Sequence, residues 1–213
     1  MIRQIFHSFG KVEAFLSAPK LRRVELSNAF LLEFLVLPVE QLISLKVNDD
    51  ETDFDPVMFV DILPRCKQLV SLEISLPPEG FIGFSTRLSI LLPTLRSLEV
   101  TCYNAADNIL RCITTPLLER LSIRYYYNRD LDGLVVDMTA FQQRSSTALL
   151  SLVFYPSITA NRGHKVTEKV IAILLQELTL NGYPNYHRTE NKGCLPQWIC
   201  VQGYDPFAVV VGW

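Results

Sequence analysis

The stretch LVSLEI, residues 69–74, decides how this chain folds. Its last two apolar residues, Leu72 and Ile74, stand two apart, which is the spacing of side chains on one face of a β-strand. The same phrase, Leu-x-x-Leu-x-Leu with other aliphatic residues or Phe in some places, recurs along the chain. Its seven occurrences are at 21–26, 42–47, 69–74, 95–100, 118–123, 149–154 and 175–180.

The period of this phrase predicts the architecture. Successive first leucines are separated by 21, 27, 26, 23, 31 and 26 residues, close to the roughly 20–29 residues of leucine-rich repeats. In such repeats each phrase forms one strand, and parallel stacking of the strands buries a continuous leucine core. We therefore expect an α/β leucine-rich-repeat solenoid. It would have a curved parallel sheet of about seven strands, with short helices or turns on the convex side.

The same pattern divides the chain into three parts. Residues 1–20 are expected to form an N-terminal cap segment, and residues 21–180 the solenoid. Residues 181–213 break the period and contain both tryptophans, so they form an irregular C-terminal tail. That tail is either a partial cap over the last repeat or a segment unrelated to the fold.

The segments between the phrases carry the expected helices. Asp55 and Pro56 suit the start of one helix, Asp107 the start of a second, and Thr167–Glu168 the start of a third. Residues 27–41 are interrupted by Pro38 and are expected to return in extended form. Residues 130–144 are expected to hold a loop and a short helix around 139–143.

Alternation along each strand points the residues between the core leucines to the opposite, concave face. Solenoids use that face for binding, so it is the candidate partner-binding site. The residues singled out are Arg23, Glu25, Lys46, Glu73, Glu99, Arg120, Arg124 and Tyr155. Glu73 and Glu99 would lie about 4.8 Å apart on neighbouring strands, where like charges repel unless a cation lies across them. They form either an acidic patch for a basic target or part of an ordinary solvated face.

Composition and charge argue against several classes of function. With 20 Lys+Arg against 22 Asp+Glu, the net charge of −2 gives no pull toward nucleic acid or an anionic membrane. RYYYNR at 124–129 mixes arginine with aromatic residues, but it ends a single strand. NDDETDFD at 48–55 lacks the glycine and the last glutamate of a calcium-binding loop. We expect no nucleic-acid partner, no membrane partner and no bound metal.

The chain also has no recognisable enzyme motif. His7, His164 and His187 are scattered without metal-ligand spacing, and the Cys-x-x-Cys, GxSxG, GxGxxG and P-loop patterns are absent. We expect no catalytic residue and no cofactor. The five cysteines and the absence of a signal peptide or membrane span favour an intracellular protein, cytoplasmic or nuclear.

The repeats resemble the leucine-rich region of fungal F-box proteins. The resemblance lies in stretches such as LPVEQLISLKV (37–47), ILPRCKQLVSLEISLP (62–77) and LLPTLRSLEVT (91–101), and it covers residues 12–180. Cys66, three residues before Leu69, fits the cysteine-containing type of repeat. The asparagine that follows the strand in many leucine-rich repeats is missing here.

This resemblance implies the substrate-recognition repeats of a ubiquitin-ligase receptor, or a truncated remnant of one. In that family an F-box holds a Skp-family adaptor and the repeats hold the target. Residues 1–20 are too short for an F-box, so the adaptor is expected as a partner only if an F-box lies upstream. The target protein is unknown. The alternatives are a structural gene fragment without a specific partner and, less favoured by the charge balance, a nucleic-acid-binding module.

Overall fold

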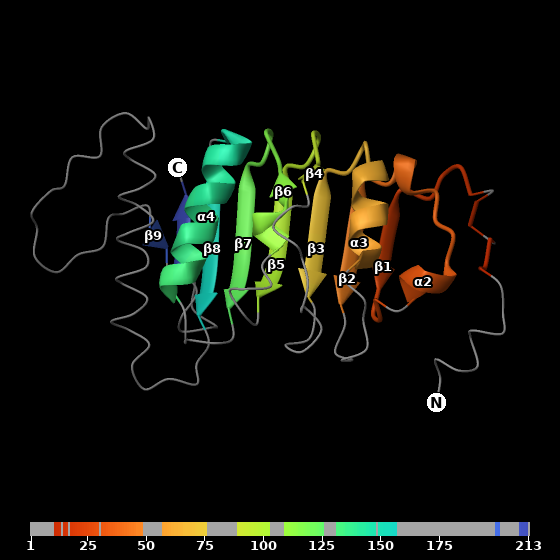
Figure 1. Cartoon of the computed structure of the whole chain (residues 1–213), viewed down its shortest axis with the longest axis horizontal. Coiled ribbons are helices and arrows are strands. Elements are labelled where there is room, and N and C mark those ends of the chain that lie inside the picture. The colour runs from red at the N-terminus through yellow and green to blue at the C-terminus, as the bar shows by residue number, and fades with distance from the viewer. Residues whose placement is uncertain are drawn as a thin grey trace, which may run out of the picture.

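The chain forms a mixed α/β structure with a mostly parallel sheet (Figure 1). The computed structural model describes residues 11–13, 15–16, 18–29, 31–48, 57–75, 89–102, 109–125, 131–147, 149–156, 199–200 and 209–212. All structural statements below concern these residues.

Six strands lie side by side in chain order, and each is parallel to its neighbours (Figure 1). They are β1 (Arg23–Leu26), β2 (Ser44–Asn48), β3 (Ser71–Ser75), β5 (Ser97–Cys102), β7 (Arg120–Tyr125) and β8 (Ser151–Pro156). Each of them coincides with one leucine phrase, so the sequence located all six strands.

The far end of the sheet differs from the expectation. The seventh phrase, at 175–180, lies outside the described residues, and the place next to β8 is occupied by β10 (Val209–Gly212). β10 runs antiparallel to β8 and also pairs with β9 (Ile199–Cys200). The edge of β8 is therefore covered by a strand from the tail.

The second layer lies against one face of the sheet (Figure 1). Its helical elements are α2 (Leu31–Phe34), η1 (Val39–Gln41), α3 (Val57–Ile62), η2 (Leu63–Arg65), η4 (Ile109–Arg111) and α4 (Leu131–Ser145). Between α3 and α4 this layer contains a parallel strand pair, β4 (Ile90–Leu91) and β6 (Ile113–Thr114). Across the described ranges, no helix combines the length and the apolar character needed to cross a membrane.

The connecting segments follow the predictions in part. The helix expected after Pro56 is present as α3, but Asp107 is followed only by the turn η4 because Ile113 joins β6. Residues 27–41, expected to return in extended form, contain two short helical turns, α2 and η1, with one isolated bridge from Leu35 to Val12 between them. The helix expected after Thr167 and the apolar stripe of residues 2–9 lie outside the described residues.

The segment before β8 is the clearest misprediction among the connections. In place of a loop and a short helix, it forms the 15-residue helix α4. Met138 and Phe141 are buried beneath this helix, and Arg144 donates hydrogen bonds to the carbonyl oxygens of Leu110 and Ile113. These tertiary contacts stabilise α4, although the helix propensity of its sequence is weak.

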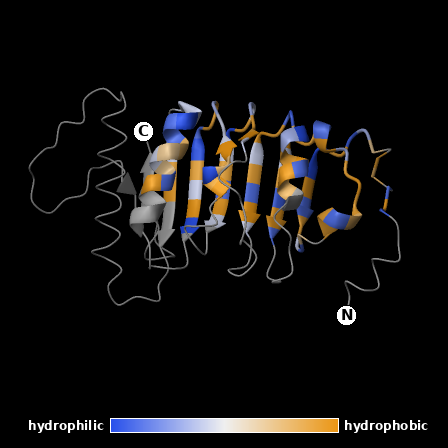
Figure 2. Cartoon of the chain, viewed as in Figure 1, coloured by the Kyte–Doolittle hydropathy of each residue, from blue (hydrophilic) through white to orange (hydrophobic). Residues whose placement is uncertain are grey.

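The core lies between the two layers. Along the strands, hydrophobic and hydrophilic residues alternate (Figure 2), and the leucine positions of the phrases face inward. Leu98 is 1% exposed, and its ladder neighbours Leu72 and Leu121 are equally buried. From the second layer, Phe59 and Phe141 complete the same cluster. This continuous packing is the main source of stability.

One hydrogen-bond arrangement recurs where each strand begins. The carbonyl oxygen of Arg22 accepts the amides of Ile43 and Ser44, at 2.7 and 3.1 Å. The corresponding carbonyl oxygens of Ile43, Val70, Arg96 and Glu119 each accept two amides from the next strand in the same way, at 2.8–3.0 Å. Successive strands are therefore joined with one geometry, although the segments between them differ in length and type.

Side chains add a second set of links at the same end of the strands. Gln41 Nε2 donates to the carbonyl oxygens of Ala18 and Leu21, at 2.7 and 3.1 Å. The single hydroxyl hydrogen of Thr94 is shared between the carbonyl oxygens of Lys67 and Leu69, which lie 3.1 and 2.9 Å from Oγ1. Thr147 Oγ1 donates to the carbonyl oxygen of Leu118 at 2.6 Å. These links satisfy backbone acceptors between successive phrases.

Candidate functional site: the open face of the sheet

The face of the sheet opposite the helices carries polar and charged side chains. We call it the open face and define it by two rows of residues that the ladder register aligns. The first row is Arg23, Ser44, Ser71, Ser97, Arg120 and Ser151. The second row is Glu25, Lys46, Glu73, Glu99, Ser122 and Val153.

A shorter third row extends the open face toward the strand ends. It runs through Asn48, Ser75, Thr101, Arg124 and Tyr155, and its Thr101 is buried. The backbone of Tyr155 pairs with that of Arg124, whereas the Tyr155 side chain lies outside the described part. Seven of the eight residues singled out from the sequence thus have described side chains on one face.

Several charges on this face lie in ion pairs between neighbouring strands. Lys46 Nζ lies 3.1 Å from Glu73 Oε1 and 3.4 Å from Glu25 Oε1, so one ammonium group bridges carboxylates on both neighbouring strands. The hydrogen bond with Glu73 is the main reason that the pKa of Lys46 is raised. On the other side of Glu73, Glu99 Oε1 accepts Arg124 Nε at 2.9 Å.

These ion pairs revise the acidic-patch hypothesis. Glu73 and Glu99 are register partners, as the sequence predicted, but each has its own cation from a neighbouring strand. The repulsion that would have called for a basic target is therefore offset within the chain. The open face is a surface of mixed charge.

Two arginines of the first row take no part in the ion pairs of this face. Arg23 in β1 and Arg120 in β7 are exposed, and neither forms an ion pair with another residue of the described part. They lie four strands apart, which is about 19 Å at the usual strand spacing. The serines of β2, β3 and β5 occupy the row between them.

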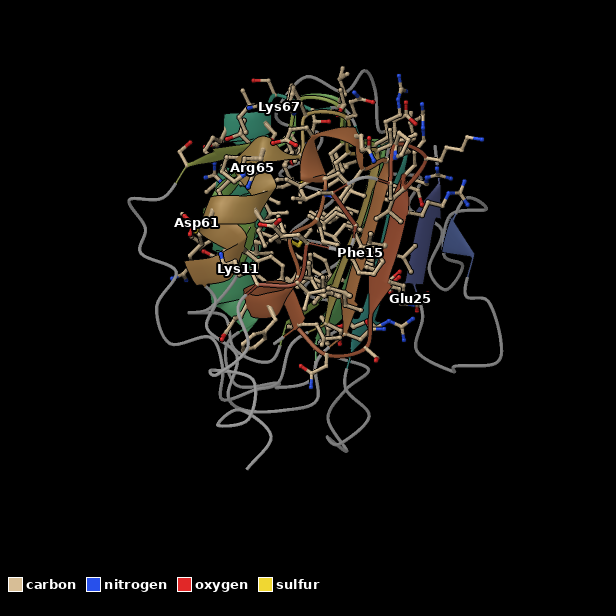
Figure 3. All side chains as sticks on the ribbon, turned by 90° about the vertical axis from the view of Figure 1, so that its right-hand side faces the viewer. Lys11, Phe15, Glu25, Asp61, Arg65 and Lys67 are labelled. Carbon is tan, nitrogen blue, oxygen red and sulfur yellow. The ribbon has the colours of Figure 1, made fainter. Side chains whose placement is uncertain are left out.

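The open face has a shallow depression of about 230 Å³ at its β1–β3 end. Polar side chains of Arg23, Ser44, Lys46, Ser71 and Glu73 line it. Figure 3 shows the molecule from this end, with Glu25 on the open face and Asp61 and Arg65 on the helix side. A depression of this size can receive a side chain of a partner but is smaller than typical ligand pockets.

Sequence reasoning missed one charged pair close to this surface. Arg96 and Glu119 occupy equivalent positions in adjacent phrases, directly after the first leucine, and their side chains form an ion pair. Opposite charges at the same position of neighbouring phrases were the signal that could have revealed it. The pair lies directly before the first residues of β5 and β7.

The groups capable of nucleophilic or metal chemistry are separate from this face. Cys66 is a buried free thiol, and burial raises its pKa to about 12, so it is protonated at neutral pH. Burial also raises the pKa of the Cys112 thiol. Within the ranges that the structure describes, no group of three or more His, Cys, Asp or Glu residues is arranged to hold a metal ion.

No family model, no curated protein and no solved structure matches the chain.

Proposed function

We propose that this chain is a protein-recognition module, a leucine-rich-repeat solenoid that binds a target protein through its open face. The target is bound as the substrate of an F-box-type ubiquitin-ligase receptor, of which this chain forms the repeats. An intracellular location, cytoplasmic or nuclear, belongs to the same proposal. The buried free thiol of Cys66 supports it, because reduced structural cysteines are typical of reducing compartments.

The observation that carries the proposal is the alignment of polar side chains across the parallel strands. The register joins equivalent positions of successive phrases, and the same two-amide junction occurs at five strand pairs. A surface built in this way presents side chains from many repeats at regular spacing. Solenoid proteins use such surfaces to bind extended segments of other proteins.

The charges define the kind of target. Glu73 and Glu99 are already paired, whereas Arg23 and Arg120 have no carboxylate partner in the described part. A guanidinium group binds a carboxylate through two parallel hydrogen bonds. The target is therefore expected to present acidic side chains toward these two arginines, with its backbone or small polar groups above the serines.

The experiment is a capture of targets from the native cell with matched variants. Ser71→Arg places a long side chain in the depression on the open face. Gln68→Arg adds the same side chain three residues earlier, in the exposed turn ahead of β3. A target that binds the wild type and Gln68→Arg but not Ser71→Arg, confirmed with the purified proteins, supports the proposal. A target set that is identical for all three proteins contradicts it.

A second experiment tests the ligase assignment separately. We expect that the 213-residue chain alone does not copurify with a Skp-family adaptor. A fusion with an F-box ahead of Met1 should copurify with it. With that fusion, the captured target should become ubiquitinated, and Ser71→Arg should abolish the modification. Stoichiometric adaptor recovery with the 213-residue chain would place an adaptor-binding surface on the repeats and contradict the proposal.

A further inference from the structure

The first strand of the sheet has an edge that no described segment covers. Among the strands that the structure describes, β1 is the terminal one and pairs with β2 alone. Residues 11–21 lie at this end of the molecule, and their backbone hydrogen bonds connect to one another or to residues 34–36, not to β1. An uncovered strand edge is a template for pairing with another strand.

The ladder register shows which backbone groups face outward. The amide of Ser44 donates to the carbonyl oxygen of Arg22, and Arg23 is the register partner of Ser44. Because bonding residues alternate along a parallel ladder, residues 22, 24 and 26 bond to β2. The backbone groups of Arg23 and Glu25 therefore face away from the sheet.

The charges of the side chains at this edge are complementary between two copies of the chain. In an antiparallel pair of two β1 strands centred on Val24, Arg23 of each copy lies opposite Glu25 of the other. The outward-facing backbone groups of these residues then form hydrogen-bonded pairs of the antiparallel type. The side chains of Arg23 and Glu25 are both exposed, Glu25 by 68%, although Glu25 Oε1 also lies 3.4 Å from Lys46 Nζ of its own chain. In the pair of strands, Glu25 would therefore be shared between Lys46 and Arg23 of the other copy.

Apolar side chains near the same edge are also exposed. Phe15 and Leu16 are 39% and 48% exposed, and Figure 3 shows Phe15 on the end of the molecule that β1 borders. Val24 of β1 is only partly buried and packs at the margin of the core. Pairing of two edges would bring Val24 of both copies together at the two-fold axis and cover more of its apolar surface.

We propose that two copies of this chain associate through their β1 edges, antiparallel and two-fold symmetric. The interface joins Arg23 of each copy to Glu25 of the other and continues the sheet from one copy into the next. This inference goes beyond the proposed function and does not rest on it, but both use Arg23, so a copy within the dimer has Arg120 left for an acidic target. The short strand implies a weak dimer, formed at micromolar or higher protein concentration.

Sedimentation analysis over a range of concentrations, with the full 213-residue chain, tests the proposal. Arg23→Glu places two glutamates opposite two glutamates, and Glu25→Arg places two arginines opposite two arginines. Each single variant should raise the dimer dissociation constant about tenfold or more, since like charges on paired strands repel. The double variant R23E/E25R should return the constant to within about threefold of the wild type.

A mixture of the two single variants gives the sharpest test. Arg23→Glu and Glu25→Arg copies are complementary to each other, so the mixture should form a heterodimer under conditions where each variant alone is a monomer. Thermal melts of the separate variants check that both are folded. A wild type that stays monomeric at the highest attainable concentration overturns the proposal. So does a dimer whose dissociation constant is unchanged in both single variants.

Discussion

The two faces of the sheet are built from alternate residues of the same six strands but contribute differently to the molecule. On the helix side, Leu72, Leu98 and Leu121 form a row with almost no exposed surface. On the open face, the neighbouring row contains Glu73, Glu99 and Ser122, which are only half-buried. The first row supplies buried apolar surface that stabilises the fold. Substitutions in the second row should change stability much less.

The largest effect is expected from the buried row. Leu98→Ala removes a side chain that is 1% exposed, and we expect it to lower the free energy of unfolding by about 2–5 kcal/mol. Leu91→Ala is the matched control, because Leu91 is 52% exposed and should cost less than about 1 kcal/mol. Urea titrations measure both. Coincident midpoints for the wild type and Leu98→Ala would contradict the repeat frame.

A smaller effect is expected where the second layer is joined to the sheet by charge. Asp137 Oδ1 in α4 accepts Arg111 Nε at 2.7 Å, and the Asp137 side chain is 7% exposed. Asp137→Ala leaves Arg111 without this acceptor and should lower the free energy of unfolding by about 2 kcal/mol. Val136→Ala, at an exposed position of the same helix, should leave the melting temperature almost unchanged. Equal melting temperatures for both variants would show that the ion pair is irrelevant to stability.

The hydrogen bonds between repeats rank third. Thr94→Val keeps the shape of the side chain but removes the hydroxyl that donates to Lys67 and Leu69. We expect a loss of about 1 kcal/mol, the usual net value of a hydrogen bond. Thr94→Ser retains a donor and should recover part of that loss in the same denaturant titration. If Thr94→Val is as stable as the wild type, the hydrogen bond of the Thr94 hydroxyl does not contribute to stability.

The smallest effect is expected on the open face. Glu99→Lys breaks the pair with Arg124, and since exposed ion pairs contribute little, the cost should be about 0.5 kcal/mol. High salt should reduce the difference, because the interaction is screened. The swap E99K/R124E should restore the wild-type stability. A loss as large as that of Leu98→Ala would mean that this face is structural and not a variable surface.

The strands and their register could be predicted because the signal for them is local in the sequence. The two-residue alternation in Leu-x-x-Leu-x-Leu dictates which side chains share a face, so the strands, the register and the rows of the open face followed from spacing alone. Arg23 and Ser44, for example, are register partners because each stands two residues after the first leucine of its phrase.

The features that the sequence did not predict depend on tertiary contacts. The pairing of Lys46 with both Glu25 and Glu73 depends on side chains from three strands, and no single phrase contains it. The length of α4 depends on Phe141 packing and on Arg144 reaching the carbonyl oxygens of Leu110 and Ile113. Such contacts join residues 21–34 positions apart, so local propensity cannot predict them.

By itself, then, the sequence determined the number and order of the parallel strands up to β8 and the division of their residues between two faces. Short-range periodicity is sufficient for this, because side-chain direction in a strand is set by backbone geometry. Only the tertiary structure decided that Glu25, Glu73 and Glu99 of the open face each lie beside a cation, that β10 borders β8, and that the edge of β1 is left uncovered by the described chain. These features depend on which distant groups meet in space, and their energies come from pairs that exist only after the chain has folded.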